Sequence, residues 1–230
     1  MSRYCSVFLP NLTRSLLTVK SMMKPQYVVA ACLTLLTGIA NAQSFSNSRD
    51  STIIYFGQPD TTSYGQVFNS AGGTLTDWSF FADSGNAGNL GLVISAWDGV
   101  KAVGPALYQS SVFSYAGGAQ SLSFNGINKS FSAGSYIAYL TVAGVNGAAS
   151  NVGIAGSSTD GGMSGGFRFL NSDGVDPLTL DQSWSNWNVA NMQYSANFVS
   201  AVPEPESLAL MLAGLGLVGA VARRRVRPQA

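Results

Sequence analysis

The sequence contains no histidine, and its only glutamates are Glu204 and Glu206. Without histidine, Ser-His-Asp and Cys-His catalytic arrangements and histidine-based zinc sites are excluded. Its only cysteines, Cys5 and Cys32, lie in a segment that we expect to be removed. The mature protein is therefore expected to lack thiols and disulfides and to depend on its hydrophobic core for stability.

Charged residues are scarce as well, at 10% of the chain. Four lysines and arginines precede Gln43 and four follow Ala222, which leaves only Arg49, Lys101, Lys129 and Arg168 in the central region. Nine aspartates oppose these four cations, so the region from Gln43 to Val202 has a net charge of −5. Such an acidic module is a poor candidate for binding nucleic acid or an anionic membrane surface.

The N-terminal segment has the three parts of a secretory signal peptide. Basic residues up to Lys24 precede an apolar run from Tyr27 to Ile39, and Ala40 and Ala42 then occupy the small-residue positions before Gln43. We therefore predict signal-peptidase cleavage after Ala42. The alternative, an N-terminal membrane anchor, is disfavoured by the shortness of the run and by these small residues.

Translation is compatible with a start at Met1, Met22 or Met23, and in each case the first 42 residues are not part of the fold. We predict three regions: an extension and signal peptide at 1–42, a folded domain at 43–201, and a C-terminal signal at 202–230.

The C-terminal region begins with Val202, Pro203, Glu204 and Pro205. An uncharged stretch then runs from Ser207 to Ala222, and the arginines follow it: Arg223, Arg224, Arg225 and Arg227. As a helix this stretch would be about 24 Å long, slightly less than a hydrocarbon core. The arginines that follow can extend their charged ends to the membrane surface and so make up the missing length. They also mark this end of the helix as cytoplasmic. The pattern predicts one transmembrane helix over 207–222 that holds the protein in the membrane before processing.

The peptide ahead of this stretch is kept extended by Pro203 and Pro205, which fix φ and lack N–H donors. A Val-Pro-Glu-Pro peptide, an apolar segment and an arginine cluster in this order resemble the PEP-CTERM sorting signal of Gram-negative, exopolysaccharide-producing bacteria. The resemblance implies recognition by a membrane-embedded exosortase, removal of the tail and delivery to the cell surface or extracellular matrix. The alternative is a plain C-terminal membrane anchor.

The central region is predicted to be all-β. Short alternating segments separated by Gly, Ser, Asn and Asp favour an antiparallel β-sandwich, most simply jelly-roll-like. The expected strands are 52–56, 65–68, 74–80, 90–97, 106–113, 121–124, 135–142, 152–155, 167–170 and 192–199, with Trp78 and Trp97 in the core. Turns are expected over Asp83–Asn89 and at Asp98-Gly99. The region also resembles a jelly-roll-like module found ahead of PEP-CTERM signals.

With neither histidine nor glutamate in this region, the acid–base candidates for catalysis are aspartates. Two aspartates in one cleft would suit glycoside hydrolysis, but aspartates in such turn-rich sequences are more often turn residues. Asn171, Asp173 and Asp176 form an oxygen-rich loop that would suit calcium, and Asp83, Asn86 and Asn89 form another; turn capping is the alternative for both.

Trp184 and Trp187 lie in a polar loop, where indole rings would offer sugars an apolar stacking face. The alternative is a loop folded over the end of the sandwich. The sequence thus predicts an exported, non-enzymatic component of the cell surface or matrix that binds exopolysaccharide. A surface glycoside-active enzyme that uses an aspartate pair is the alternative.

Overall fold

The structure is a computed structural model that describes residues 42–171, 182–200 and 211–219. The strands belong to one compact unit and the helix at 211–219 to another, and each is considered by itself.

The β-unit confirms the predicted all-β class. Its described strands are β1 (Ala42–Ser46), β2 (Ser51–Phe56), β3 (Ser63–Asn86), β4 (Gly88–Trp97), β5 (Ala102–Gln109), β6 (Phe113–Tyr115), β7 (Gln120–Thr141), β8 (Ser150–Ser157), β9 (Gly165–Leu170), β10 (Asn191–Met192) and β11 (Tyr194–Val199). All pairs of these strands are antiparallel.

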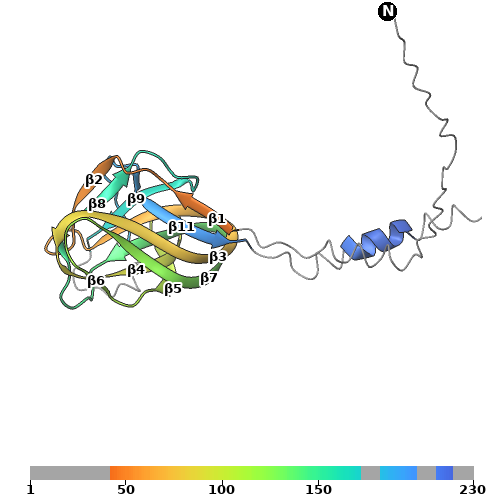
Figure 1. Cartoon of the computed structure of the whole chain (residues 1–230), viewed down its shortest axis with the longest axis horizontal. Helices are drawn as coiled ribbons and strands as arrows, with labels where there is room; N and C mark the ends of the chain where they lie inside the picture. The colour runs from red at the N-terminus through yellow and green to blue at the C-terminus, as the bar shows by residue number, and fades with distance from the viewer. Residues whose placement is uncertain (1–41, 172–181, 201–210, 220–230) are drawn as a thin grey trace, which may run out of the picture. The chain divides into compact units, whose positions relative to one another are not determined.

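A long ribbon of β3 and β7 organises the β-unit and curves across it (Figure 1). The pairing runs from Ser63 opposite Thr141 to Ala82 opposite Gln120. The sequence predicted four separate strands here, and this prediction was wrong. Gly72 and Gly73 have φ values of 101° and 130°, which a glycine adopts at little cost, so β3 bends there while its pairing with β7 continues on both sides and shifts register only between Leu75 and Asp77.

The bend lets one ribbon contribute to both layers of a sandwich. Its first half lies between β9 on one side and β4 with β5 on the other, and its second half lies beside β11 and β1. Strand β8 pairs with β2, with β10 and with the end of β3. The predicted antiparallel sandwich is thereby confirmed.

The main core fills the space between the layers. Trp78 and Phe80 are each 1% exposed, as predicted from their period-two spacing. Trp78 stacks on Tyr194 with ring centroids 5.3 Å apart, and Phe68 contacts it at 4.9 Å. Because these residues come from distant parts of the chain, the core depends on the pairing of β3 with β11.

A second hydrophobic cluster covers the outer face of the first layer, which consists of β9, the first half of the β3–β7 ribbon, β4 and β5. Along β4, Leu92 and Ile94 enter the main core, whereas Val93 and Trp97 enter this second cluster. This alternation is the one that the sequence predicts. The layer is therefore buried on both faces, and its outer cover includes Trp184.

The two predicted turns have different outcomes. At Asp98-Gly99 the turn is confirmed: the Asp98 carboxylate accepts bonds of 2.8 and 2.9 Å from the backbone N–H groups of Val100 and Lys101. The long turn over Asp83–Asn89 was wrong, because β3 continues to Asn86 and β4 begins at Gly88. Pairing of the end of β3 with β8 keeps this stretch extended.

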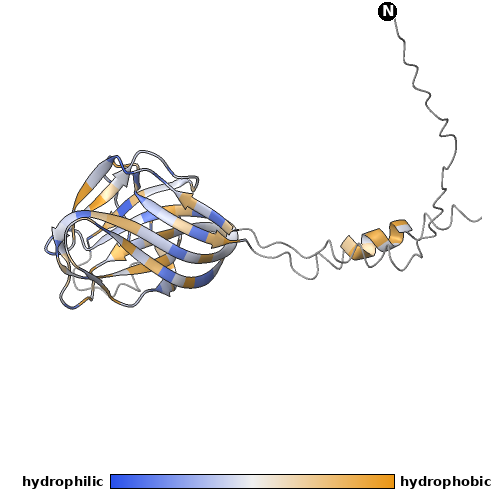
Figure 2. Cartoon of the chain, in the orientation of Figure 1, coloured by the Kyte–Doolittle hydropathy of each residue, from blue (hydrophilic) through white to orange (hydrophobic). Residues whose placement is uncertain are grey.

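The C-terminal unit is described as a helix over residues 211–219. It is apolar along its length (Figure 2), and as an α-helix it is about 14 Å long. Within the described residues, no helix combines the length and the apolar character needed to cross a membrane. Of the predicted transmembrane helix over 207–222 the structure describes only these nine positions, three of which are glycines, so the span stays a prediction. Residues 207–210 and 220–222 lie outside the described part.

Candidate functional site

Both predicted processing sites flank the same pair of neighbouring strands. Strand β1 begins at the exposed Ala42, which lies opposite Val199 near the end of β11. The chain thus enters and leaves the β-unit at one end of this pair. Of the predicted processing residues, Ala40 and the sorting motif at 202–205 lie outside the described residues, as do the arginines at 223–227.

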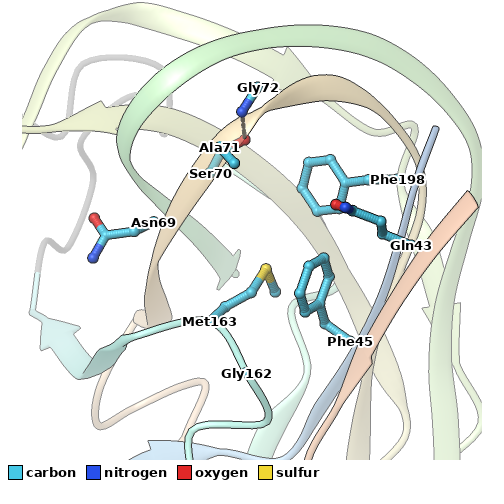
Figure 3. Close-up of a pocket in the computed structure, with 9 residues that line it drawn as sticks. All are labelled: Gln43, Phe45, Asn69, Ser70, Ala71, Gly72, Gly162, Met163 and Phe198. Atoms are coloured by element: carbon cyan, nitrogen blue, oxygen red, sulfur yellow. Dashed lines mark hydrogen bonds between the residues drawn. The ribbon is translucent and has the colours of Figure 1, made fainter. Parts of the chain in front are cut away.

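A shallow pocket of about 240 Å³ lies beside this strand pair (Figure 3). Phe45 of β1 and Phe198 of β11 form its apolar wall, with ring centroids 6.0 Å apart in a T-shaped contact. Met163 faces these rings and Gln43 lies next to Phe198. Cleavage after Ala42 would therefore place the new N-terminus on the pocket wall.

Most polar groups of this pocket are already bonded within the protein. The Asn69 amide donates to the backbone and hydroxyl oxygens of Ser164 and points away from the two rings (Figure 3). The Ser70 hydroxyl accepts a 3.0 Å bond from the N–H of Gly72. The volume is also below the usual range of ligand pockets, so this pocket is a weak candidate for a binding site.

The structure separates the two tryptophans that were predicted to bind sugar. Trp184 is 6% exposed and contacts Trp97 and Tyr139 at 6.3 and 5.1 Å between ring centroids. Its backbone N–H donates to the carbonyl of Val100. A ring held in this way offers no free face to a sugar, so the structure does not support Trp184 as a stacking platform.

Trp187 keeps 36% of its surface exposed. Its ring lies 4.4 Å from Phe169 and meets Tyr64 at 5.7 Å with an interplanar angle of 88°. A contact with Phe167 at 6.0 Å completes its support. Trp187 is therefore a fixed and partly exposed aromatic ring, and its predicted role in sugar binding stays a prediction.

Tyr64, which supports Trp187, is also bonded to strand β2, where two neighbouring apolar residues that the sequence did not single out are exposed. Ile54 and Tyr55 of β2 are 49% and 55% exposed. The Tyr64 hydroxyl donates a 2.5 Å bond to the carbonyl of Ile54, and burial, as the largest cause, together with the nearby Asp60 charge raises the pKa of this hydroxyl. It therefore remains a donor at physiological pH. We call the exposed surface of Ile54, Tyr55 and Trp187 the aromatic edge.

No sequence signal marked Tyr55 for exposure. Simple alternation along β2 would bury Tyr55 with Ile53, but an irregularity in the pairing with β8 lies between Ile53 and Phe56. Tyr55 has a φ of 71° there, and a bulge of this kind redirects side chains.

The described aspartates mostly stabilise turns and strand contacts. Their partners differ: Asp50 accepts from Ser158, Asp77 from Gly126, Asp98 from Val100 and Lys101, and Asp160 from Gly162, whereas Asp83 accepts from Thr52 and pairs with Arg49 at 2.9 Å. Backbone and hydroxyl donors lower the pKa of Asp50 and Asp98. Such bonds are typical of structural carboxylates.

The calcium predictions fall partly outside the described chain. Asn171 is exposed, whereas Asp173 and Asp176 lie outside the described residues, so that site stays a prediction. In the other loop, Asp83 is paired with Arg49, and the amides of Asn86 and Asn89 donate to Ser150 and to the carbonyl of Asn146. In the described part of the chain, no three His, Cys, Asp or Glu residues lie close enough together to hold a metal ion.

Comparison with known proteins bears on the C-terminal segment. A family model described as the PEP-CTERM protein-sorting motif matches residues 201–225. The chain carries a PEP-CTERM sorting signal. The signal implies an exported protein that an exosortase processes towards the cell surface. Because the match is confined to this segment, it leaves the activity of the β-unit open.

No curated protein matches the chain. Among solved structures, the CBM36-1 domain of a multidomain xylanase from the hindgut metagenome of Trinervitermes trinervoides is similar over 52% of this chain and 99% of that domain. The identity is 19% and the TM-score is 0.27. A TM-score this low carries no argument about the fold or the function of the β-unit.

Proposed function

We propose that this protein is a non-enzymatic component of the cell surface or extracellular matrix, processed by an exosortase and bound to the surrounding exopolysaccharide. The observation that carries the proposal is the PEP-CTERM signal directly after the last strand. The described strand β11 ends at Val199, five residues before Glu204. Five extended residues span at most about 18 Å, so processing near Pro203 to Glu206 leaves the folded β-unit close to whatever accepts its C-terminus.

The chemistry of the mature region supports a binding role over a catalytic one. The chain has no histidine, and its two glutamates lie within the segment that the sorting signal occupies. Five of the six described aspartates each have their own donors, as set out above. A cleft with two free carboxylates, as glycoside hydrolysis requires, is not among the features of the described residues.

The sorting half of the proposal is tested with Glu204→Ala, which alters the Pro-Glu-Pro peptide, and Glu206→Ala, which leaves it intact. Because the prolines restrict this peptide, its binding costs little conformational entropy. We expect the exosortase to recognise the carboxylate of Glu204. Cells that make each full-length protein are fractionated, and the C-terminal peptide is identified by mass spectrometry. We expect wild-type and Glu206→Ala protein to lose Arg223–Arg227 and Glu204→Ala protein to keep them. If the wild type keeps its arginines, the tail acts only as an anchor.

The binding half is tested with processed protein recovered from the cell surface. It is incubated with purified exopolysaccharide of the producing strain, and bound protein and polysaccharide chain length are measured by co-sedimentation and light scattering. We expect binding without any shortening of the polysaccharide. Shortening would favour the glycoside-active enzyme, and a lack of binding would refute a polysaccharide-bound role.

A further inference from the structure

The exposed large apolar side chains of the β-unit are unevenly distributed. Among the described residues of this unit they are Ile54, Tyr55, Val100, Val112 and Trp187. Three of the five make up the aromatic edge, whose two parts are joined through Tyr64: its hydroxyl bonds to the carbonyl of Ile54 and its ring contacts Trp187. Clustered apolar exposure of this kind marks an interaction surface, whereas single exposed residues are normal.

The backbone of β2 holds Tyr55 in solvent at a conformational cost. A φ of 71° is unfavourable for a tyrosine and persists only where the surrounding structure imposes it. Two contacts impose it here: the N–H of Thr61 donates to the carbonyl of Tyr55 at 3.1 Å, and Tyr64 donates to the carbonyl of Ile54 at 2.5 Å. The strain thus turns outward an aromatic ring that regular alternation would bury.

The second ring of the aromatic edge is equally well fixed. Three aromatic side chains support Trp187, as described above, and its segment is anchored where Ser185 and Phe169 exchange two backbone bonds of 2.8 and 3.0 Å. Its neighbours in the chain, Asn186 and Asn188, are exposed as well. A rigid and partly exposed indole can stack on the C–H face of a sugar at a low cost in entropy.

We propose that the aromatic edge binds a neutral saccharide chain, with Tyr55 and Trp187 as stacking platforms. The inference rests on the proposed function and gives its polysaccharide-binding site a location on the β-unit. The mature region is acidic, with a net charge of −5 from Gln43 to Val202, which favours a neutral ligand over an anionic one. An anionic polymer would be repelled.

The test uses full-length chains expressed in the producing strain and recovered after processing. The variants are Tyr55→Ala, Trp187→Ala, the double variant, and Trp187→Phe, which keeps an aromatic ring. Val112→Ala is the matched control, since Val112 is 62% exposed and lies between β5 and β6. Two probes are titrated, with Kd measured by calorimetry: neutral oligosaccharides from partial acid hydrolysis of the strain's own exopolysaccharide, and alginate as an anionic polymer.

We expect each alanine variant to weaken binding of the neutral oligosaccharides about tenfold and the double variant more, while Val112→Ala and Trp187→Phe stay within about threefold. Alginate should bind at least tenfold more weakly than the neutral probe.

Circular dichroism checks folding, and Tyr55→Ala alone decides the question if Trp187→Ala does not fold. Wild-type binding that survives Tyr55→Ala unchanged overturns the site and leaves the proposed function standing. Tighter binding of alginate overturns the ligand class. If the wild type binds neither probe nor the intact polysaccharide, the binding half of the proposed function falls as well.

Light scattering of the same variants tests the competing occupant, a second copy of the chain. We expect all of them to have the wild-type mass. A mass that falls in Tyr55→Ala, with saccharide binding unchanged, would identify the aromatic edge as a self-association surface and overturn the proposal.

Discussion

Trp184 and Trp187 lie three residues apart in the chain and on opposite faces of the first layer. Trp184 contacts Tyr139, whereas Trp187 contacts Tyr64. In the pairing of β3 with β7, Tyr139 lies opposite Gly65, the residue after Tyr64, so the two tyrosines face opposite ways. The segment between the tryptophans therefore wraps around the edge of the layer at β9.

This arrangement predicts unequal losses of stability for the two tryptophans. Trp184→Ala should cost about 3–5 kcal/mol because it opens a cavity under the loop. Trp187→Ala should cost less than about half of that, because more than a third of the ring is already in solvent. Urea unfolding monitored by far-UV circular dichroism measures both. Equal losses would contradict the assignment of Trp184 to a buried cluster.

Phe80→Ala tests the main core. The side chain is 1% exposed and contacts Trp78 at 5.7 Å, so its removal should cost about 3–5 kcal/mol out of the 5–15 kcal/mol typical of a domain. Ser79→Ala, on the other face of the same strand, should change the free energy of unfolding by less than about 0.5 kcal/mol. A loss below about 1 kcal/mol for Phe80→Ala would mean that the two faces of β3 are assigned wrongly.

Alkaline stability should depend on Tyr194. Burial raises the pKa of its hydroxyl to about 12, and this hydroxyl donates to the carbonyl of Asp160. The folded state thus favours the protonated form more than the unfolded state does, whose pKa is about 10. Its contribution is complete below about pH 10 and is lost as the pH rises from about 10 to 12.

Phenolate absorbance and urea midpoints measured between pH 8 and 12 test this dependence. Tyr194→Phe should flatten the fall in stability above pH 10, whereas Tyr55→Phe, on an exposed side chain, should leave it unchanged. An unaltered alkaline slope in Tyr194→Phe would assign the loss of stability to another group.

Signal-peptidase cleavage after Ala42 should give a mature protein that begins at Gln43. The cut removes only one residue of β1, and the pairing from Gln43 opposite Phe198 to Ser46 opposite Ser195 remains. N-terminal sequencing of exported protein, after treatment for a pyroglutamate block, gives the result directly. A mature protein that retains Met22–Ala42 would refute the prediction.

The local pattern of the sequence determined the C-terminal sorting signal and, along strands such as β4, which face each side chain takes. The PEP-CTERM signal is read from a few consecutive residues, and the alternation of Leu92 with Val93 depends only on the two-residue period of a strand. Both are properties of neighbouring residues, so no knowledge of the fold was needed.

Contacts between distant segments decided the rest. Whether Gly72 and Gly73 end a strand or bend it depends on β7, which continues to pair on both sides of them. Burial of Trp184 requires Tyr139 and Trp97 to form a surface for it, and exposure of Tyr55 requires the Tyr64 hydroxyl to hold the carbonyl of Ile54. Local sequence sets which face of a strand a side chain takes. Strands far along the chain decide whether that face is covered or left exposed to solvent.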